Sequence, residues 1–197
     1  MPIKQYLANK DATITNASSV TGNPGSSANI GGADSLELFS LYTGASENLT
    51  SKARLLIQFP VEQIEQDLQN SALPEQNVKY FLRLFNVEHN LSVPSNFSAS
   101  VFPVSGAWDE GFGTDLDSYS TPGWSNLPSG SGVTWKYRAS GSMWIDPGGD
   151  YYHDYDLTAG FDTGFEDIEL DVTSVMEEWL DNSLERSGFL IKLSGSF

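Results

Sequence analysis

The sequence contains no cysteine and few basic residues, and each shortage excludes a class of chemistry. Without cysteine the chain cannot form disulfides, bind zinc through thiolates or use a cysteine nucleophile. Its 10 basic residues face 26 acidic ones, a net charge of −16, so the chain is not expected to bind nucleic acid, which needs clustered Lys and Arg. No run of apolar residues is longer than three, so the sequence predicts neither a membrane span nor a signal-peptide core, and no membrane partner is expected.

The apolar content is sufficient for one substantial core, since 39% of the 197 residues are hydrophobic and 12% are aromatic. Alternating or apolar segments predict strands at 11–16, 36–42, 53–59, 78–87, 97–104, 167–172 and 188–194. Helical spacing predicts short helices near 61–68 and 174–181. We therefore expect an all-β fold: a single antiparallel β-sandwich of jelly-roll type with two short helices, preceded by an N-terminal arm at 1–10, with the sandwich domain at 11–197.

The spacing also predicts finer details. The segment 78–87 is apolar on both faces, which is typical of a central strand, and 97–104 is expected beside it. Thr173 and Ser174 are expected to cap the second helix, because Ser174 and Glu177 have the spacing of a capping box. The expected core comprises Leu38, Leu55, Ile57, Phe59, Leu82, Leu84, Val101, Ile168, Leu170, Trp179, Leu190 and Leu193.

Acidic residues are concentrated in one part of the chain. Thirteen of them lie between Asp109 and Asp171, where the only basic residues are Lys136 and Arg138. Such a cluster can bind calcium through carboxylates of adjoining loops, or it can simply be a solvated acidic surface. No segment has the spacing of a twelve-residue calcium-binding loop, so both interpretations stay open. The candidate calcium ligands are Asp146, Asp150, Asp154 and Asp156.

No pattern in the sequence predicts catalysis, and we expect the protein not to be an enzyme. There are only two histidines, His89 and His153, and no Gly-x-Ser-x-Gly elbow to support a catalytic triad. Acidic residues are so numerous that some pair would reach the separation of a glycosidase by chance. The Gly-rich stretch at 22–32 lacks the Lys of a phosphate-binding loop.

Aromatic residues are frequent between 108 and 155, and two roles fit them. Trp and Tyr stack on sugar rings, and they also fill cores and anchor protein interfaces. The structural role is expected for Trp108, Trp135 and Trp179, because large aromatic side chains usually serve the core. The candidates for glycan binding are Trp124, Trp144, Tyr151, Tyr152 and Tyr155.

A series of short motifs resembles the DNRLRE-type β-sandwich domain, a relative of carbohydrate-binding modules found in cell-surface and phage proteins. The motifs follow one another between about residues 11 and 194, and each is weak alone. They are GSSANIG at 25–31, RLLIQF at 54–59, FLRLF at 81–85, VSGAWDEG at 104–111, VTW at 133–135, DVTSVMEEWL at 171–180 and GFLIK at 188–192. The N-terminal residues 1–17 and the segments LELFSLY and FPVEQI look like a variant found in tailed phages of marine bacteria.

This resemblance implies a virion structural protein without enzymatic activity, in the capsid, neck or tail, assembled in the host cytoplasm. Its expected partners are other virion proteins and copies of itself. The alternative is a carbohydrate-binding module that recognises host surface glycan, with or without calcium.

Two features predict how copies or partners would be joined. The N-terminal arm carries Lys4, Tyr6, Leu7 and Lys10, which suit docking on another subunit, although a frayed tail or an ordinary first strand fits equally. The resemblance also implies a further strand after 188–194, whereas the sequence ends at Phe197. Either the polypeptide has been shortened or the strand at 188–194 is expected to leave an open sheet edge, which is a template for pairing.

Overall fold

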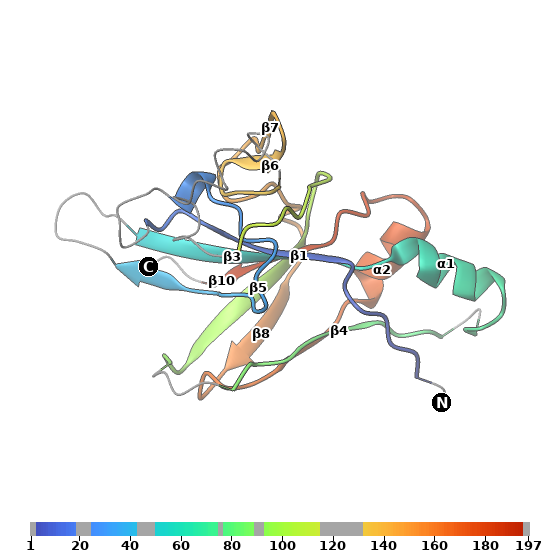
Figure 1. Ribbon diagram of the computed structural model, residues 1–197. Helices are drawn as coiled ribbons and strands as arrows, with labels where there is room; N and C mark the ends of the chain where they lie inside the picture. The colour runs from blue at the N-terminus through green and yellow to red at the C-terminus, as the bar shows by residue number, and fades with distance from the viewer. Residues whose placement is uncertain are drawn as a thin grey trace.

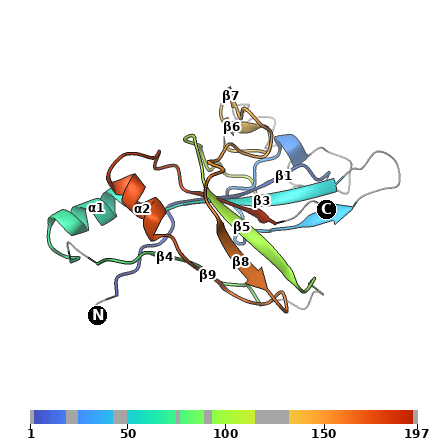
Figure 2. The same cartoon turned by 180° about the vertical axis from the view of Figure 1, so that it is seen from behind.

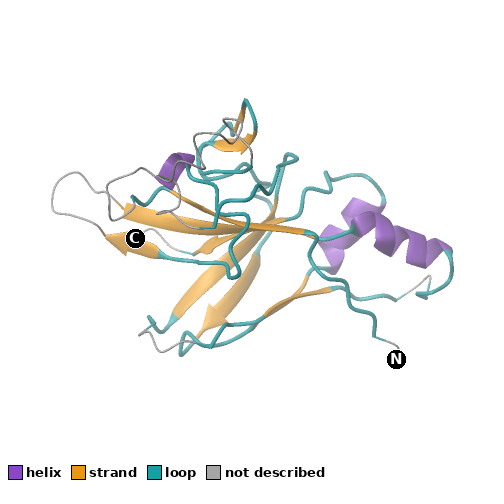
Figure 3. Cartoon of the chain, in the orientation of Figure 1, coloured by secondary structure: helices purple, strands orange, loops and turns teal. Residues whose placement is uncertain are grey.

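A computed structural model describes residues 3–18, 25–42, 50–74, 77–88, 93–114 and 132–194. Its centre is an antiparallel sheet of six strands (Figure 1). The order across this sheet is β1 (Lys10–Thr15), β3 (Thr50–Gln58), β10 (Phe189–Leu193), β5 (Phe97–Pro103) and β8 (Leu157–Phe161), with β2 (Ser40–Tyr42) also paired to β3. The other strands of the described residues form two small antiparallel pairs: β4 (Phe81–Leu84) with β9 (Ile168–Asp171), and β6 (Tyr137–Ala139) with β7 (Ser142–Met143). The helices are α1 (Val61–Gln69), α2 (Thr173–Leu180) and a 3-10 turn, η1 (Gly25–Ser27) (Figure 3).

The six-stranded sheet is covered on both faces. Leu55, Leu56 and Ile57 follow one another in β3 and are all buried, and Phe189–Ile191 in β10 repeats this pattern. Because successive side chains of a strand point to opposite faces, a continuous buried run requires a layer on each side. The sheet therefore contributes to two separate cores.

The first core, the helix-side core, lies between the sheet and the β4–β9 pair with the two helices. It contains Leu82 of β4, Ile168 of β9 and Trp179 of α2, packed against sheet residues such as Ile57 and Phe189. Val61 and Ile64 turn one side of α1 into this core, and α1 lies beside α2 in both views of the molecule (Figures 1 and 2). The antiparallel β-sandwich with two short helices is thus confirmed.

The second core, the loop-side core, lies on the opposite face under the β6–β7 hairpin (Figure 1). Here the covering layer is made of loops, and large tryptophans fill the space that strands would otherwise occupy. The structural role predicted for Trp108 and Trp135 is confirmed, as it is for Trp179 in the other core. The loop-side core comprises Ala12, Ile14, Leu56, Val104, Trp108, Val133, Trp135, Trp144 and Leu190.

Most expected core positions are confirmed, but two strand placements are wrong. Seven expected residues are buried and the remaining five, Leu38, Phe59, Leu84, Leu170 and Leu193, are half-buried. The segment 78–87 is not a central strand, since β4 covers only Phe81–Leu84 and pairs with β9 alone among the described strands. The expected open edge at 188–194 is also wrong, because β10 lies between β3 and β5 and pairs with both.

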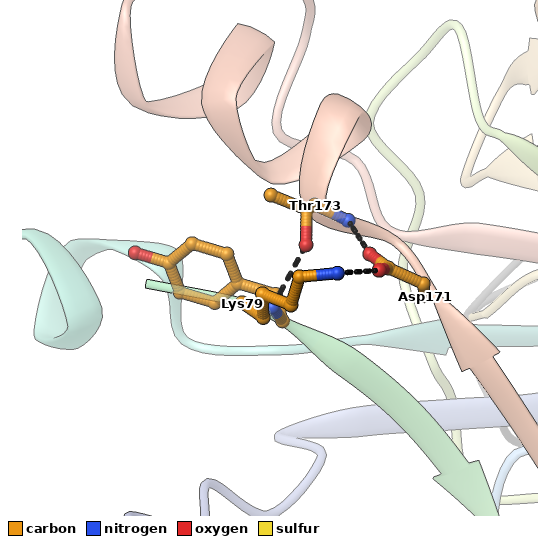
Figure 4. A network of polar contacts seen from close by, with 4 residues as sticks. Lys79, Asp171 and Thr173 are labelled. Atoms are coloured by element: carbon orange, nitrogen blue, oxygen red, sulfur yellow. Dashed lines mark hydrogen bonds and ion pairs between the residues drawn. The ribbon is translucent and has the colours of Figure 1, made fainter. Parts of the chain in front are cut away.

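The expected capping of α2 by Thr173 and Ser174 is wrong as well, because Val172 occupies the N-cap position and makes no side-chain capping hydrogen bond. The Thr173 hydroxyl oxygen instead accepts a hydrogen bond from the backbone N–H of Tyr80, at 3.0 Å (Figure 4). The Asp171 carboxylate accepts the backbone N–H of Thr173 at 3.0 Å and pairs with Lys79 at 3.2 Å. These bonds, led by those from Thr173, hold the pKa of Asp171 below its usual value, and they fasten β4 to the start of α2.

Candidate functional site

Three of the predicted site residues meet in one hollow on the loop-side face of the sheet. Asp146, Asp150 and Tyr151 line it together with Arg54 and His153. Its volume is about 280 Å³, and we call it the larger hollow. It joins residues about a hundred positions apart, because Arg54 comes from β3 whereas the others come from the loop between β7 and β8.

Arg54 is fixed in this hollow by contacts with its neighbours. Its Nη1 donates a hydrogen bond to the backbone oxygen of Gly148 at 2.6 Å. Its guanidinium carbon lies 4.8 Å from the centre of the Trp135 ring, which is the geometry of a cation–π contact. Burial lowers the pKa of Arg54, and nearby Tyr151 opposes this shift.

Tyr151 is held between other aromatic rings. The centre of its ring lies 4.6 Å from that of Phe102 on β5 and 4.4 Å from that of His153. Its hydroxyl oxygen accepts a hydrogen bond from Nζ of Lys192 on β10, at 2.8 Å. The Tyr151 hydroxyl hydrogen therefore remains available to a ligand, because this residue is only half-buried.

The remaining glycan candidates lie elsewhere. Trp144 is wrong as a sugar platform, because it is buried in the loop-side core and its Nε1 donates to the backbone oxygen of Thr134 at 3.0 Å. Tyr152 and Tyr155 pack against the helix-side core. Burial and a hydrogen bond to Glu178 raise the pKa of Tyr155 to about 12. Trp124 lies outside the described residues.

The expected calcium ligands are not brought together. Both oxygens of the Asp150 carboxylate accept backbone N–H groups, from Ile145 at 2.8 Å and Asp146 at 2.9 Å, so this side chain shapes its own loop. Asp154 and Asp156 do not join Asp146 and Asp150 in a cluster. Within the described part of the chain, no three acidic or histidine side chains gather closely enough to hold a metal ion.

The residues of the N-terminal arm contact their own chain. Nζ of Lys4 and the hydroxyl of Tyr6 both donate to the carboxylate of Asp67 on α1. These bonds lower the pKa of Asp67, and burial together with the same carboxylate raises the pKa of Tyr6. Lys10 begins β1 and donates to the backbone oxygen of Trp108 at 3.0 Å, whereas Leu7 remains 85% exposed.

A second surface was not predicted from the sequence. On the outer side of β4 and the loop after it, Phe81, Phe85 and Val87 are 52%, 68% and 62% exposed. Arg83 lies between the two phenylalanines, pairs with Glu169 of β9 at 2.9 Å and stacks over the ring of Phe85 at 5.6 Å. We call these five residues the β4–β9 face. The apolar side chains alternate visibly in the sequence, but because both faces of 78–87 are partly apolar, the pattern predicts a covered central strand and not an exposed face.

Comparison with family models, with curated proteins and with solved structures found no match. Among the described residues, no helix combines the length and the apolar character needed to cross a bilayer.

Proposed function

We propose that the protein is a non-enzymatic structural protein of a tailed-phage virion that docks on other virion proteins or on copies of itself. The observation that carries this proposal is the β4–β9 face, on which two phenylalanines and a valine stay exposed around one arginine. Clustered exposed apolar side chains are costly in water and typically mark a surface that another protein covers. The resemblance to the phage variant of the DNRLRE-type domain supports the same assignment.

The composition of this face suits protein recognition. Aromatic residues and Arg are enriched at the centre of protein interfaces, and they supply most of the binding free energy there. β4 is paired with β9 over its whole length, from Phe81↔Asp171 to Leu84↔Ile168, so the strand that begins at Phe81 and leads into Phe85 is held in place before docking. A surface that is already ordered loses less conformational entropy on binding.

The test is incorporation into particles. We expect Phe85→Ser to lower the number of copies per virion, counted by quantitative mass spectrometry of purified particles, because it removes an exposed anchor without opening a cavity. Met143→Ser on β7, which is also exposed, serves as the matched control and should leave incorporation unchanged. Equal incorporation of the two variants, with both folded, would contradict the proposal.

The larger hollow favours a second function, the recognition of host glycan. The half-buried side chain of Tyr151 offers a hydroxyl hydrogen, and Asp146 and Asp150 offer acceptors, so an aromatic residue and polar groups converge as in sugar-binding sites. We expect glycan-array binding that is lost in Tyr151→Ala and partly retained in Tyr151→Phe, which keeps the ring. An array that shows no binding by the folded wild-type protein excludes this second function.

A further inference from the structure

A smaller hollow on the same face of the sheet is lined by three basic side chains. Lys52 and Arg54 of β3 and Lys192 of β10 line it together with Ser40 of β2, and no acidic residue does. Its volume is about 70 Å³, and we call it the basic hollow. The chain has a net charge of −16 and only 10 basic residues, so three basic side chains around one hollow are not expected from its composition.

The strand pairing explains why the three cations meet. Lys52 and Arg54 are two residues apart in β3, so their side chains share the face that also bears Leu56. Lys192 shares the corresponding face of β10 with Leu190, which pairs with Leu56. Along β3, residues 55–57 pair with β10 and residues 50–52 pair with β2. The basic hollow lies between these two stretches, where the partner of β3 changes from β10 to β2.

None of the three charges is neutralised by the described residues. Lys4, Lys79, Arg83 and Arg186 each have a carboxylate within 4.0 Å, but no carboxylate of the described residues lies that close to Lys52, Arg54 or Lys192. Within the described residues, Nη1 of Arg54 donates to the backbone oxygen of Gly148 and Nζ of Lys192 donates to the Tyr151 hydroxyl. The other N–H donors of these two side chains, and the ammonium group of Lys52, are left for a ligand. Adjacent cations that lack counter-charges repel one another, and an anion between them would remove that cost.

We propose that the basic hollow binds an anionic group, a carboxylate, sulfate or phosphate, between Lys52, Arg54 and Lys192. Its volume corresponds to roughly five water molecules, which suits such a group but not a sugar ring. The group is therefore either a free anion or the acidic substituent of a larger ligand, such as an acidic sugar. Arg54 also lines the larger hollow, where the rest of a larger ligand would lie.

The negative net charge of the protein does not prevent this binding. At physiological ionic strength, charges beyond about 8 Å are largely screened, and no acidic residue lines the basic hollow itself. A planar guanidinium binds carboxylate and sulfate oxygens through two parallel hydrogen bonds, and the two ammonium groups add point charges. The anion site does not depend on the proposed role in the virion, because Lys52, Arg54 and Lys192 share the sheet face of Leu56 and Leu190, which is opposite to the face that β4 and β9 cover.

Titration of the full chain at constant ionic strength tests the site. The probes are sulfate, phosphate, glucuronate and, as the uncharged counterpart, glucose, with binding followed by calorimetry and by NMR of the Arg54 side chain. We expect Arg54→Gln to weaken anion binding about tenfold or more and Lys52→Gln to weaken it several-fold, because each removes a charge-assisted contact. Lys136→Gln is the matched control, since Lys136 is exposed and does not line the hollow.

Each outcome decides a different point. Glucuronate binding well above sulfate and phosphate, with glucose inactive, supports the anion site and assigns it to an acidic sugar. Sulfate or phosphate binding as tightly as glucuronate supports a site for the free anion. The proposal is overturned if none of the anions binds, or if Lys136→Gln weakens binding as much as Lys52→Gln. Lys52 is half-exposed and belongs to neither core, so its substitution is expected to leave the fold intact.

Discussion

At the scale of single residues, Trp179 combines complete burial with an unsatisfied polar group. It is 0% exposed, its ring centre lies 4.8 Å from that of Phe189, and its Nε1 has no hydrogen-bond partner among the described residues. Trp108 is buried equally deeply, but its Nε1 donates to the backbone oxygen of Ser187 at 2.8 Å. The two tryptophans therefore fill their cores alike and differ in what their N–H groups contribute.

We expect Trp179→Ala to lower the free energy of unfolding by about 3–5 kcal/mol, because a large cavity opens in the helix-side core. Trp179→Phe should cost less than about 2 kcal/mol, since it keeps an aromatic ring and removes an unpaired buried donor. Trp108→Phe should cost more than Trp179→Phe, because it leaves the Ser187 oxygen without its donor. Urea unfolding of the three variants measures these differences, and the reverse order of the two Phe variants would show that Trp179 Nε1 is satisfied.

Glu166 stabilises the loop before β9 through its charged form. Its carboxylate accepts the backbone N–H and the hydroxyl of Thr163 and the N–H of Gly164, at 2.7 to 2.8 Å, and these bonds lower its pKa to about 2. A depressed pKa in the folded state means that the contribution to stability is complete above the ordinary value near 4.5. It is lost as the pH falls toward 2.

We therefore expect Glu166→Gln to be less stable than the wild-type protein at neutral pH, with a difference that shrinks between about pH 4.5 and pH 2. Unfolding free energies from denaturant titrations at several pH values measure this difference. Glu62→Gln is the control, because Glu62 is exposed on α1 and its carboxylate forms no hydrogen bond or ion pair with the described residues. A difference that is constant with pH would mean that the charge of Glu166 contributes nothing.

At the scale of elements, the entry into β10 depends on a glycine. Gly188 has a φ of +85°, and a Cβ there would lie 2.3 Å from the backbone oxygen of Ile57 in β3. Gly141 in the β6–β7 turn also has a positive φ, of +70°, but a Cβ there would meet no atom within 4 Å. Comparing substitutions at Gly141 and Gly188 therefore distinguishes the free-energy cost of a left-handed backbone from the cost of a steric clash.

Gly141→Ala should lower the free energy of unfolding by about 1 kcal/mol, from backbone strain alone. Gly188→Ala should cost about 1–3 kcal/mol more, because the methyl group forces β10 away from β3 in the middle of the sheet. Thermal or urea unfolding of both variants tests the comparison. Equal costs would mean that β10 moves aside without loss of pairing.

The elements also show which features the sequence can predict. β1, β3, β5 and β10 were predicted because each is a compact run of β-branched or apolar residues that stops near a turn or a proline. β8 was missed because its residues, Leu-Thr-Ala-Gly-Phe, are mostly small and only Phe161 is buried. The neighbours of β4 were assigned wrongly because strand order depends on contacts between distant segments, which local alternation does not encode.

At the scale of the molecule, the sequence could predict some residues of the acidic segment and of the candidate site, but not how the fold places them relative to one another. The sequence indicated Asp146, Asp150 and Tyr151, but Arg54 and Lys192 join them only after β3 and β10 become neighbours in the sheet. The acidic residues of the segment 109–171 fit either a calcium site or one solvated acidic surface. Those that the structure describes are distributed: Glu110 accepts the N–H of Asp11, and Glu169 pairs with Arg83 on the opposite side of the sheet.

The net charge of −16 remains a property of the whole molecule and opposes both folding and self-association. Repulsion among exposed carboxylates is long-ranged at low salt, where the Debye length is about 30 Å at 0.01 M, and is largely screened at 0.15 M, where it is about 8 Å. We expect the urea midpoint of unfolding to rise over this range of NaCl. In contrast, the four ion pairs among the described residues are too few to give the opposite trend, because pairs at or near the surface contribute little.

A variant with reduced charge distinguishes this repulsion from a general effect of salt. Asp34→Lys combined with Asp109→Lys reverses two exposed negative charges, so the salt-dependent rise in the midpoint should become smaller. The same variant should associate more readily at low salt, as measured by light scattering, if copies meet through the β4–β9 face, which neither substitution touches. A salt-dependent rise of the same size in both proteins would instead assign the effect to salt acting on apolar surface, and would remove charge as the reason why copies stay apart.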